Sequence, residues 1–157
     1  MFSTRIRTRA LFTSAVLAEV ERACGEAEAQ HAGEIRFAVE TALALPALWQ
    51  GITPRARALQ VFAHLRIWDT HHNNGVLIYV LRADRAVEIV ADRGISAAVK
   101  TEEWQAVCHD VEAHYRVGHY AEGSLAAVTG VAQLLGRHFP APSAVHANEL
   151  PNQPILL

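Results

Sequence analysis

The fold of this chain is most constrained by one run, NNGVLIYVLRADRAVEIVADRGI, which begins at Asn73 and ends at Ile95. Within it, residues 76–81 (VLIYVL) are apolar at every position, which is typical of a strand buried on both faces. Residues 83–85 (ADR) predict a tight turn, and residues 86–91 predict the returning strand. The run therefore predicts an antiparallel hairpin in the middle of a layered domain.

Helical and alternating patterns surround this hairpin. The alternation of apolar and polar residues from Glu34 to Glu40 predicts another strand. Thr13 or Ser14 is suited to cap the helix that follows it, and Thr53-Pro54 is a typical helix start. The predicted helices cover residues 13–29, residues 54–68, a segment that begins at Thr101, and residues 120–138, after which Pro140 ends the helical pattern.

The order of these elements predicts the fold class. The long link from residues 34–40 to residues 76–81 contains a helix, so it allows a right-handed parallel crossover. The short link at residues 83–85 requires antiparallel strands. We therefore expect an α/β domain: a three-layer αβα sandwich in which helices flank a small mixed sheet.

Length and charge narrow the possible functions. The 157 residues, 51% hydrophobic, suffice for one domain, and a net charge of −2 excludes nucleic acid as the main partner. Arg5, Arg7 and Arg9 precede the apolar run LFTSAVLA, but Glu19 and Glu21 interrupt it early. It is therefore too short to span a bilayer and atypical of a signal peptide. We expect a cytoplasmic protein without a transmembrane segment; export or peripheral attachment to a membrane is the alternative.

Polar residues gather at the ends of the predicted strands, where α/β sheets often hold ligands. Carboxylate and amide oxygens are ligands for hard cations such as calcium or magnesium. Each residue also has a structural interpretation as a cap or turn. The candidate metal ligands are Asp69, Asp92, Glu34 and Glu28, and the neighbouring ligand cluster contains Asn73, Asn74, Arg93, His71 and His72.

Known catalytic motifs do not identify a catalytic residue. The chain has no P-loop, no GxGxxG run and no GxSxG nucleophile elbow. Cys24 and Cys108 lack the spacing of zinc or redox sites, so we interpret both as structural thiols, with a regulatory disulfide as the alternative. Nucleotide binding and serine-hydrolase chemistry are therefore disfavoured.

Taken in order, several short motifs give a wider resemblance. They extend over roughly residues 16–140, and their order and spacing, rather than any one of them, carry the specificity. On these motifs the chain resembles the TPM domain family, found in thylakoid lumen, bacterial envelope and animal membrane proteins. The motifs are Glu28, Gly33-Glu34-Ile35, Phe62 to Trp68 with Asp69, Asn73-Asn74-Gly75, Asp92-Arg93-Gly94-Ile95, Trp104, and Gly118-His119-Tyr120 with Gly123.

The resemblance implies two functions. Family members are linked to the assembly, repair or modulation of membrane protein complexes, which implies an accessory or binding protein with a protein partner that is membrane-associated. They are also associated with divalent cations and acid phosphatase activity, which implies a phosphatase as the alternative. Asp92-Arg93-Gly94-Ile95 stands where the family commonly has a Gly-x-Gly, and Arg93 lies inside this motif at a place where the family commonly varies. An Arg beside Asp92 can either clamp phosphate or neutralise the carboxylate in place of a metal.

Apolar residues outside the predicted core indicate where a partner would bind. Trp49 lies in an apolar loop, and Ile155 and Leu156 end an apolar tip; either can contact a partner or a second copy in a homo-oligomer. The alternative is that Trp49 covers the edge of the core. We expect an N-terminal arm (residues 1–12), a single domain (residues 13–140), and an extended or mobile tail (residues 141–157).

Overall fold

A computed structural model describes residues 8–141 and 147–157 of the chain. Residues 1–7 of the predicted arm (residues 1–12) and residues 142–146 of the predicted tail (residues 141–157) lie outside this part. The described strands form one four-stranded sheet in the order β3-β2-β1-β4. The strands are β1 (Glu34–Glu40), β2 (Gly75–Leu81), β3 (Ala86–Ala91) and β4 (Ile155–Leu156). The helices are α2 (Ser14–Glu28), α3 (Leu45–Trp49), α4 (Pro54–His64), α5 (Arg93–Ser96), α6 (Thr101–Arg116) and α7 (Tyr120–His138).

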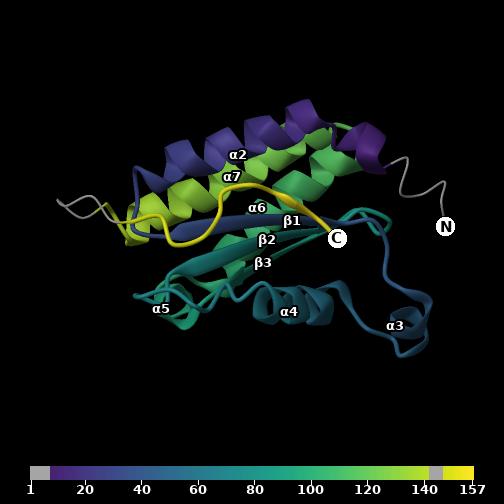
Figure 1. The fold of residues 1–157 in the computed structure, drawn as a ribbon, viewed down its shortest axis with the longest axis horizontal. Coiled ribbons are helices and arrows are strands. Elements are labelled where there is room, and N and C mark those ends of the chain that lie inside the picture. The colour runs from purple at the N-terminus through teal and green to yellow at the C-terminus, as the bar shows by residue number, and fades with distance from the viewer. Residues whose placement is uncertain (1–7, 142–146) are drawn as a thin grey trace.

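Helices lie on both faces of this sheet (Figure 1). One face packs against α2, α6 and α7, where Phe37 of β1 and Ile78 of β2 join the larger core. The other face packs against α4, where Leu77 and Tyr79 join a smaller core with Val61. The predicted three-layer αβα sandwich is confirmed.

The two central strands are completely buried. Every residue of β1 and of β2 is buried, and the strands pair in parallel from Glu34 with Gly75 to Glu40 with Leu81. β2 and β3 pair antiparallel, with Arg85 at a φ of 52° in the tight turn between them. The parallel crossover and the hairpin predicted from link lengths are both confirmed.

The helix boundaries differ from the prediction in one place. Thr13 and Thr53 cap α2 and α4 as expected, each accepting a hydrogen bond from a backbone N–H three residues ahead. However, α4 ends at His64 and not near Trp68, because the chain turns at Arg66, whose φ is 54°. The apolar pattern continues past this turn because Ile67 is still buried, so periodicity alone did not show the helix end.

Three short elements were not predicted. α3 lies in the loop after β1 and α5 follows Asp92, and both are too short to give a periodic signal. The third is β4, in which Ile155 and Leu156 pair in parallel with β1. Residues 147–157 are therefore extended along the outer edge of the sheet. At the other end of the described chain, residues 8–11 are helical and Phe12 is buried in the larger core.

Two close backbone approaches explain glycines of the hairpin run. A Cβ on Gly75 would lie 2.2 Å from the carbonyl oxygen of Ile67, and a Cβ on Gly94 would lie 2.5 Å from that of Asn73. Backbone atoms cannot yield as a flexible side chain can. These two glycines therefore fix the segment between α4 and β2 against the sheet.

Replacing Gly75 with alanine should lower the free energy of unfolding by about 2–3 kcal/mol, because the added methyl group overpacks a rigid contact. Gly136→Ala is the matched control: a Cβ there meets nothing within 4 Å, and alanine favours the α7 helix. Urea denaturation of both variants measures the difference. Equal stability of Gly75→Ala and wild type would contradict the predicted clash.

Candidate functional site

The candidate residues lie at one end of the sheet. Glu34 opens β1, Asn73 and Asn74 directly precede β2, and Asp92 directly follows β3. This end carries the amino ends of the parallel strands β1 and β2. Ligand sites of open α/β sheets usually lie at the carboxyl ends, so the position of this cluster is unusual for such a site.

Glu28 and Glu34 are buried carboxylates with local bonding roles. The Glu28 Oε1 accepts a hydrogen bond of 2.7 Å from the backbone N–H of Ile35, which ties the end of α2 to the start of β1. The Glu34 Oε1 accepts one of 3.2 Å from the N–H of Glu149. With its amide oriented to satisfy its neighbours, Asn148 donates 2.9 Å to Glu34 Oε2. Glu34 therefore holds the tail against the sheet.

Asp69, His71 and His72 lie on the surface. The Asp69 Oδ2 accepts a hydrogen bond of 2.9 Å from Arg66, in an ion pair whose side chains are both more than half exposed. The rings of His71 and His72 contact each other edge to face, and the backbone N–H of His71 donates to Glu149. Asp69 is thus bonded to its neighbour on the surface of the loop that follows α4.

The asparagine pair builds the entry to β2. Asn73 has a φ of 51°, and its carbonyl accepts a hydrogen bond from Gly94 N–H. The buried Asn74 side chain donates a hydrogen bond through Nδ2 to the carbonyl of Ala32, and the backbone N–H of Asn74 donates one to the Thr70 hydroxyl. Its Oδ1 is buried and makes no hydrogen bond among the residues that the structure describes.

Asp92 caps the short helix α5. Its Oδ1 accepts a hydrogen bond of 2.7 Å from the N–H of Arg93, and its carbonyl accepts from Ile95 and Ser96. The Oδ2 is buried without a hydrogen-bond partner in the described parts of the chain. Arg93 begins α5 and is exposed. Asp92 and Asn74 thus each have one buried side-chain oxygen that accepts no hydrogen bond from the described residues.

The candidate carboxylates do not converge within the described residues. In the sheet, Gly75 lies between Glu34 and Asp92, because it pairs with Glu34 on one side and accepts the Asp92 N–H on the other. Ile67 packs directly on Gly75 and occupies the intervening space. Over residues 8–141 and 147–157, no three His, Cys, Asp or Glu side chains are grouped in a way that could hold a metal ion. Cation binding therefore stays a prediction.

A buried polar group at the opposite end of β1 was missed by the sequence analysis. The Glu40 carboxylate accepts hydrogen bonds from Tyr79 Oη at 2.5 Å and from Arg57 Nε and Nη2 at 2.8 and 3.0 Å. Burial, followed by the bond to Glu40, raises the pKa of Tyr79, and the Glu40 bond raises the pKa of Arg57. The alternation of residues 34–40 could have predicted this contact, because it places Glu40 on the face of β1 that packs against α4.

Both cysteines have the character of structural thiols. Cys24 is fully buried and burial raises its pKa to about 12. Cys108 is half-buried beside Ile89, and burial again raises its pKa to about 12. A thiol with such a pKa is almost entirely protonated at neutral pH and therefore a poor nucleophile.

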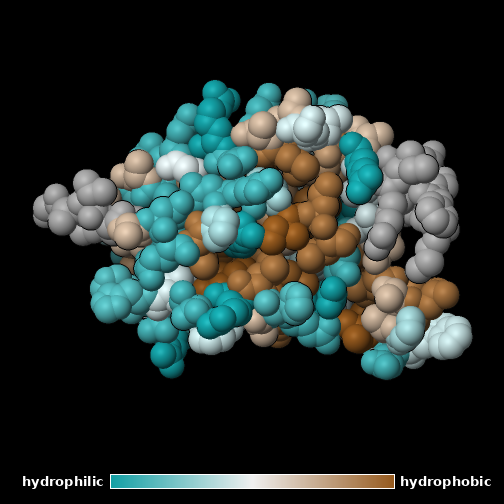
Figure 2. All heavy atoms as spheres, viewed as in Figure 1, coloured by the Kyte–Doolittle hydropathy of each residue, from teal (hydrophilic) through white to brown (hydrophobic). Residues whose placement is uncertain are grey.

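The apolar loop after β1 is the most exposed apolar part of the described chain. Trp49 is 86% exposed, and Leu45 and Leu48 are 55% and 51% exposed. α3, which carries all three, has no buried residue and is set apart from the three layers (Figure 1). Figure 2 shows its brown and pale spheres at the lower right edge of the molecule. Trp49 does not cover the core.

Sequence comparison identifies the family. The TPM domain profile matches residues 6–134, which is most of the chain. The chain belongs to the TPM domain family. No curated protein shows a significant match to this TPM domain.

Solved structures share the fold of this TPM domain. The BA42 protein of the psychrophilic bacterium Bizionia argentinensis has a TM-score of 0.79 and 27% identity, over 92% of this chain and 94% of BA42. The N-terminal domain of a P. gingivalis protein has a TM-score of 0.63 and 22% identity, over 87% and 83% of the two chains. The N-terminal domain of the cg2496 protein of Corynebacterium glutamicum has a TM-score of 0.59 and 13% identity, over 85% of this chain and 80% of that domain's chain.

Within the described residues, the TPM domain has no helix of sufficient length and apolar character to cross a bilayer.

We predict that Glu40→Gln lowers the free energy of unfolding by about 1.5–3 kcal/mol, because it weakens charge-assisted hydrogen bonds in a buried place. The matched control is Asp69→Asn, which breaks an exposed pair and should cost less than about 1 kcal/mol. Urea denaturation at pH 7 compares the two. Similar small losses in both variants would show that Glu40 does not brace α4 against the sheet.

Proposed function

We propose that this TPM domain is an accessory protein that binds a protein partner through α3, and that this partner belongs to a membrane-associated complex. The observation that carries the proposal is the 86% exposure of Trp49 at the end of a helix without a single buried residue. The neighbouring Leu45 and Leu48 enlarge the apolar surface. A cytoplasmic location is part of the same hypothesis.

The chemistry of the segment supports protein binding. Residues 41–54 contain no charged side chain, so burying this segment in an interface would not require the desolvation of a charge of its own. Large aromatic side chains such as Trp49 contribute most to the affinity of protein interfaces. A helix of five residues is also too short to be stable by itself, and a partner's groove would stabilise it.

A photo-cross-linking residue in place of Trp49 should capture the partner, whereas the same residue at Trp68 should not. Trp68 is the matched control because it is 48% exposed but stacks against Arg66 outside α3. With the purified partner, Trp49→Gln should raise Kd about 30-fold, as expected for a central interface tryptophan. Trp68→Gln should leave Kd within about twofold.

Two results would contradict the proposal. Equal Kd values for Trp49→Gln and Trp68→Gln would show that α3 is not the contact. Cross-links that join only two copies of this chain would replace the partner by a homo-oligomer, which light scattering would then confirm by a doubled mass that Trp49→Gln abolishes.

The second candidate function is a divalent-cation-dependent phosphatase. The family resemblance favours it, and the buried, uncommitted oxygens of Asp92 and Asn74 are the observation in its favour. Calcium or magnesium would take such oxygen ligands, and the exposed Arg93 beside Asp92 could contact a phosphate. Asp69 is a weaker candidate ligand, since its carboxylate is already paired with Arg66.

For this second candidate, we expect chelator-treated protein to hydrolyse an aryl phosphate only after calcium, magnesium or manganese is added. Asp92→Asn should reduce the rate at least about tenfold, as loss of a metal-site group does. Asp84→Asn is the control and should retain the rate, because Asp84 is exposed in the turn at the opposite end of β3. Absence of hydrolysis with every cation, at mildly acidic and neutral pH, would exclude this function and leave the binding proposal unaffected.

A further inference from the structure

The strand β3 forms an open edge of the sheet. In the β2–β3 register, the N–H of Asp92 donates to the carbonyl of Gly75, so alternate residues of β3 from Ala86 to Asp92 bond to β2. The N–H and C=O groups of the residues between them, Val87, Ile89 and Ala91, point away from β2. An edge of this kind pairs readily with another strand unless something covers it.

Side chains of α4 and α6 cover most of this edge. The Val87 N–H donates to Glu112 Oε1 at 3.3 Å, and Arg55 Nη1 donates to the Ile89 carbonyl at 2.6 Å. The Cys108 side chain of α6 lines the same cavity as Ile89 and lies beside it. These three side chains take the places that a fifth strand would fill, and they block strand addition along Val87 and Ile89.

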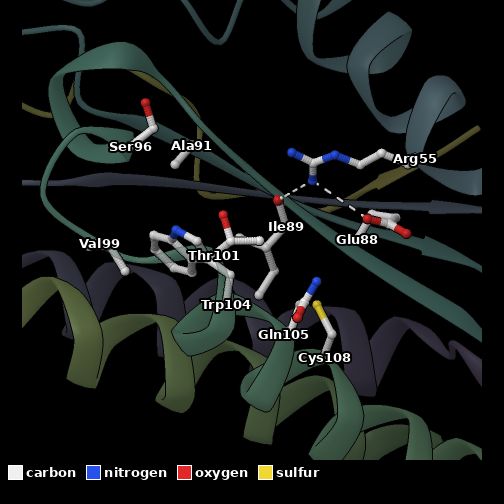
Figure 3. A pocket seen from close by; sticks show the side chains of 10 residues that line it. All are labelled: Arg55, Glu88, Ile89, Ala91, Ser96, Val99, Thr101, Trp104, Gln105 and Cys108. Carbon is white, nitrogen blue, oxygen red and sulfur yellow. Dashed lines mark hydrogen bonds and ion pairs between the residues drawn. The ribbon is translucent and has the colours of Figure 1, made fainter.

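The cover ends at Ala91. Among the residues that the structure describes, no hydrogen bond is formed by the outward N–H or C=O of Ala91. Ala91 lines a cavity of about 400 Å³ together with residues of α4, α5 and α6 (Figure 3). Its lining contains Arg55, Glu88, Ala91, Ser96, Trp104 and Gln105.

We infer that this cavity binds a short extended peptide segment of another protein, which adds to the sheet by pairing with Ala91. Addition of a strand at a sheet edge is an established mode of peptide recognition, in which main-chain hydrogen bonds give affinity. Ala91 offers one donor and one acceptor on the same side, which is the pattern that one residue of an extended peptide complements. A volume of about 400 Å³ is also within the usual range for ligand sites.

The walls of the cavity define which side chains the peptide can carry. Trp104 on α6 lies on one side of β3, while Arg55 of α4 and Glu88 lie on the other (Figure 3). Successive side chains of an extended peptide point to opposite faces. The site therefore favours an apolar residue against Trp104, followed by a polar or charged residue beside the ion pair of Arg55 and Glu88, which are 3.5 Å apart.

The site is separate from the α3 surface and is built from different elements. It can act together with the proposed partner contact or independently of it. The blocked groups at Val87 and Ile89 limit the pairing to the end of the strand, so recognition is confined to a few residues. That limit is compatible with a protein that must not aggregate through its sheet edge.

The test uses the full chain and random heptapeptides displayed on phage. Peptides that are selected on wild type should bind Ala91→Pro at least about tenfold more weakly, because proline removes the outward N–H that would donate to the peptide. Ala91→Ser keeps this N–H and should bind as wild type does. Neither variant removes a hydrogen bond of the β2–β3 ladder, since the Ala91 N–H makes no bond to β2.

Amide hydrogen exchange on wild-type protein makes the test independent of any variant. The Ala91 amide should exchange at least about tenfold more slowly when a selected synthetic peptide is bound, because the peptide then accepts its hydrogen bond. The Val87 amide, already bonded to Glu112, should change little. No enriched peptide, equal binding to Ala91→Pro, or an unprotected Ala91 amide would each overturn the inference. None of these results depends on Trp49.

Discussion

The parallel pairing of β1 with β2 is the interaction on which the rest of the structure depends. Both strands are buried at every residue, so each face of the pair must be covered by helices. The crossover that joins them carries α4 to one face, and α2 and α7 pack on the other. β3 and β4 are then added at the two sides of this pair, which fixes where the sheet is open.

Polar residues serve this architecture more than they form a single pocket. Glu28 anchors the start of β1, Glu34 anchors the tail, Asp92 caps α5, and Glu40 holds α4 through Arg57. Glu28, Glu34 and Glu40 thus satisfy groups that are wholly or partly buried, whereas the Asp92 bond to Arg93 is exposed. Among the described residues, Asn74 Oδ1 at the entry to β2 and Asp92 Oδ2 at the exit from β3 are buried without a hydrogen-bond partner.

The sequence was sufficient to predict the sandwich, the crossover and the hairpin, because long apolar runs, alternation and link lengths carry that information. It also predicted which residues end the strands, but not what they bond. Glu34 contacts a tail more than a hundred residues away in sequence, and Glu40 meets a helix across the sheet, and such contacts leave no local pattern. The sequence likewise did not predict that Trp49 is exposed, because an apolar loop can either pack on the core or project into solvent.

The tail has a consequence for folding during synthesis. Arg36 Nη1 donates to the carbonyls of Pro151 and Gln153, which are 115 and 117 residues further along the chain, and Leu157 N–H donates to Val39. The outer edge of β1 therefore stays uncovered until these last residues have left the ribosome. Nascent chains therefore expose a pairing edge from the time β1 emerges until residues 151–157 emerge, which is the interval in which chaperones would have to protect it.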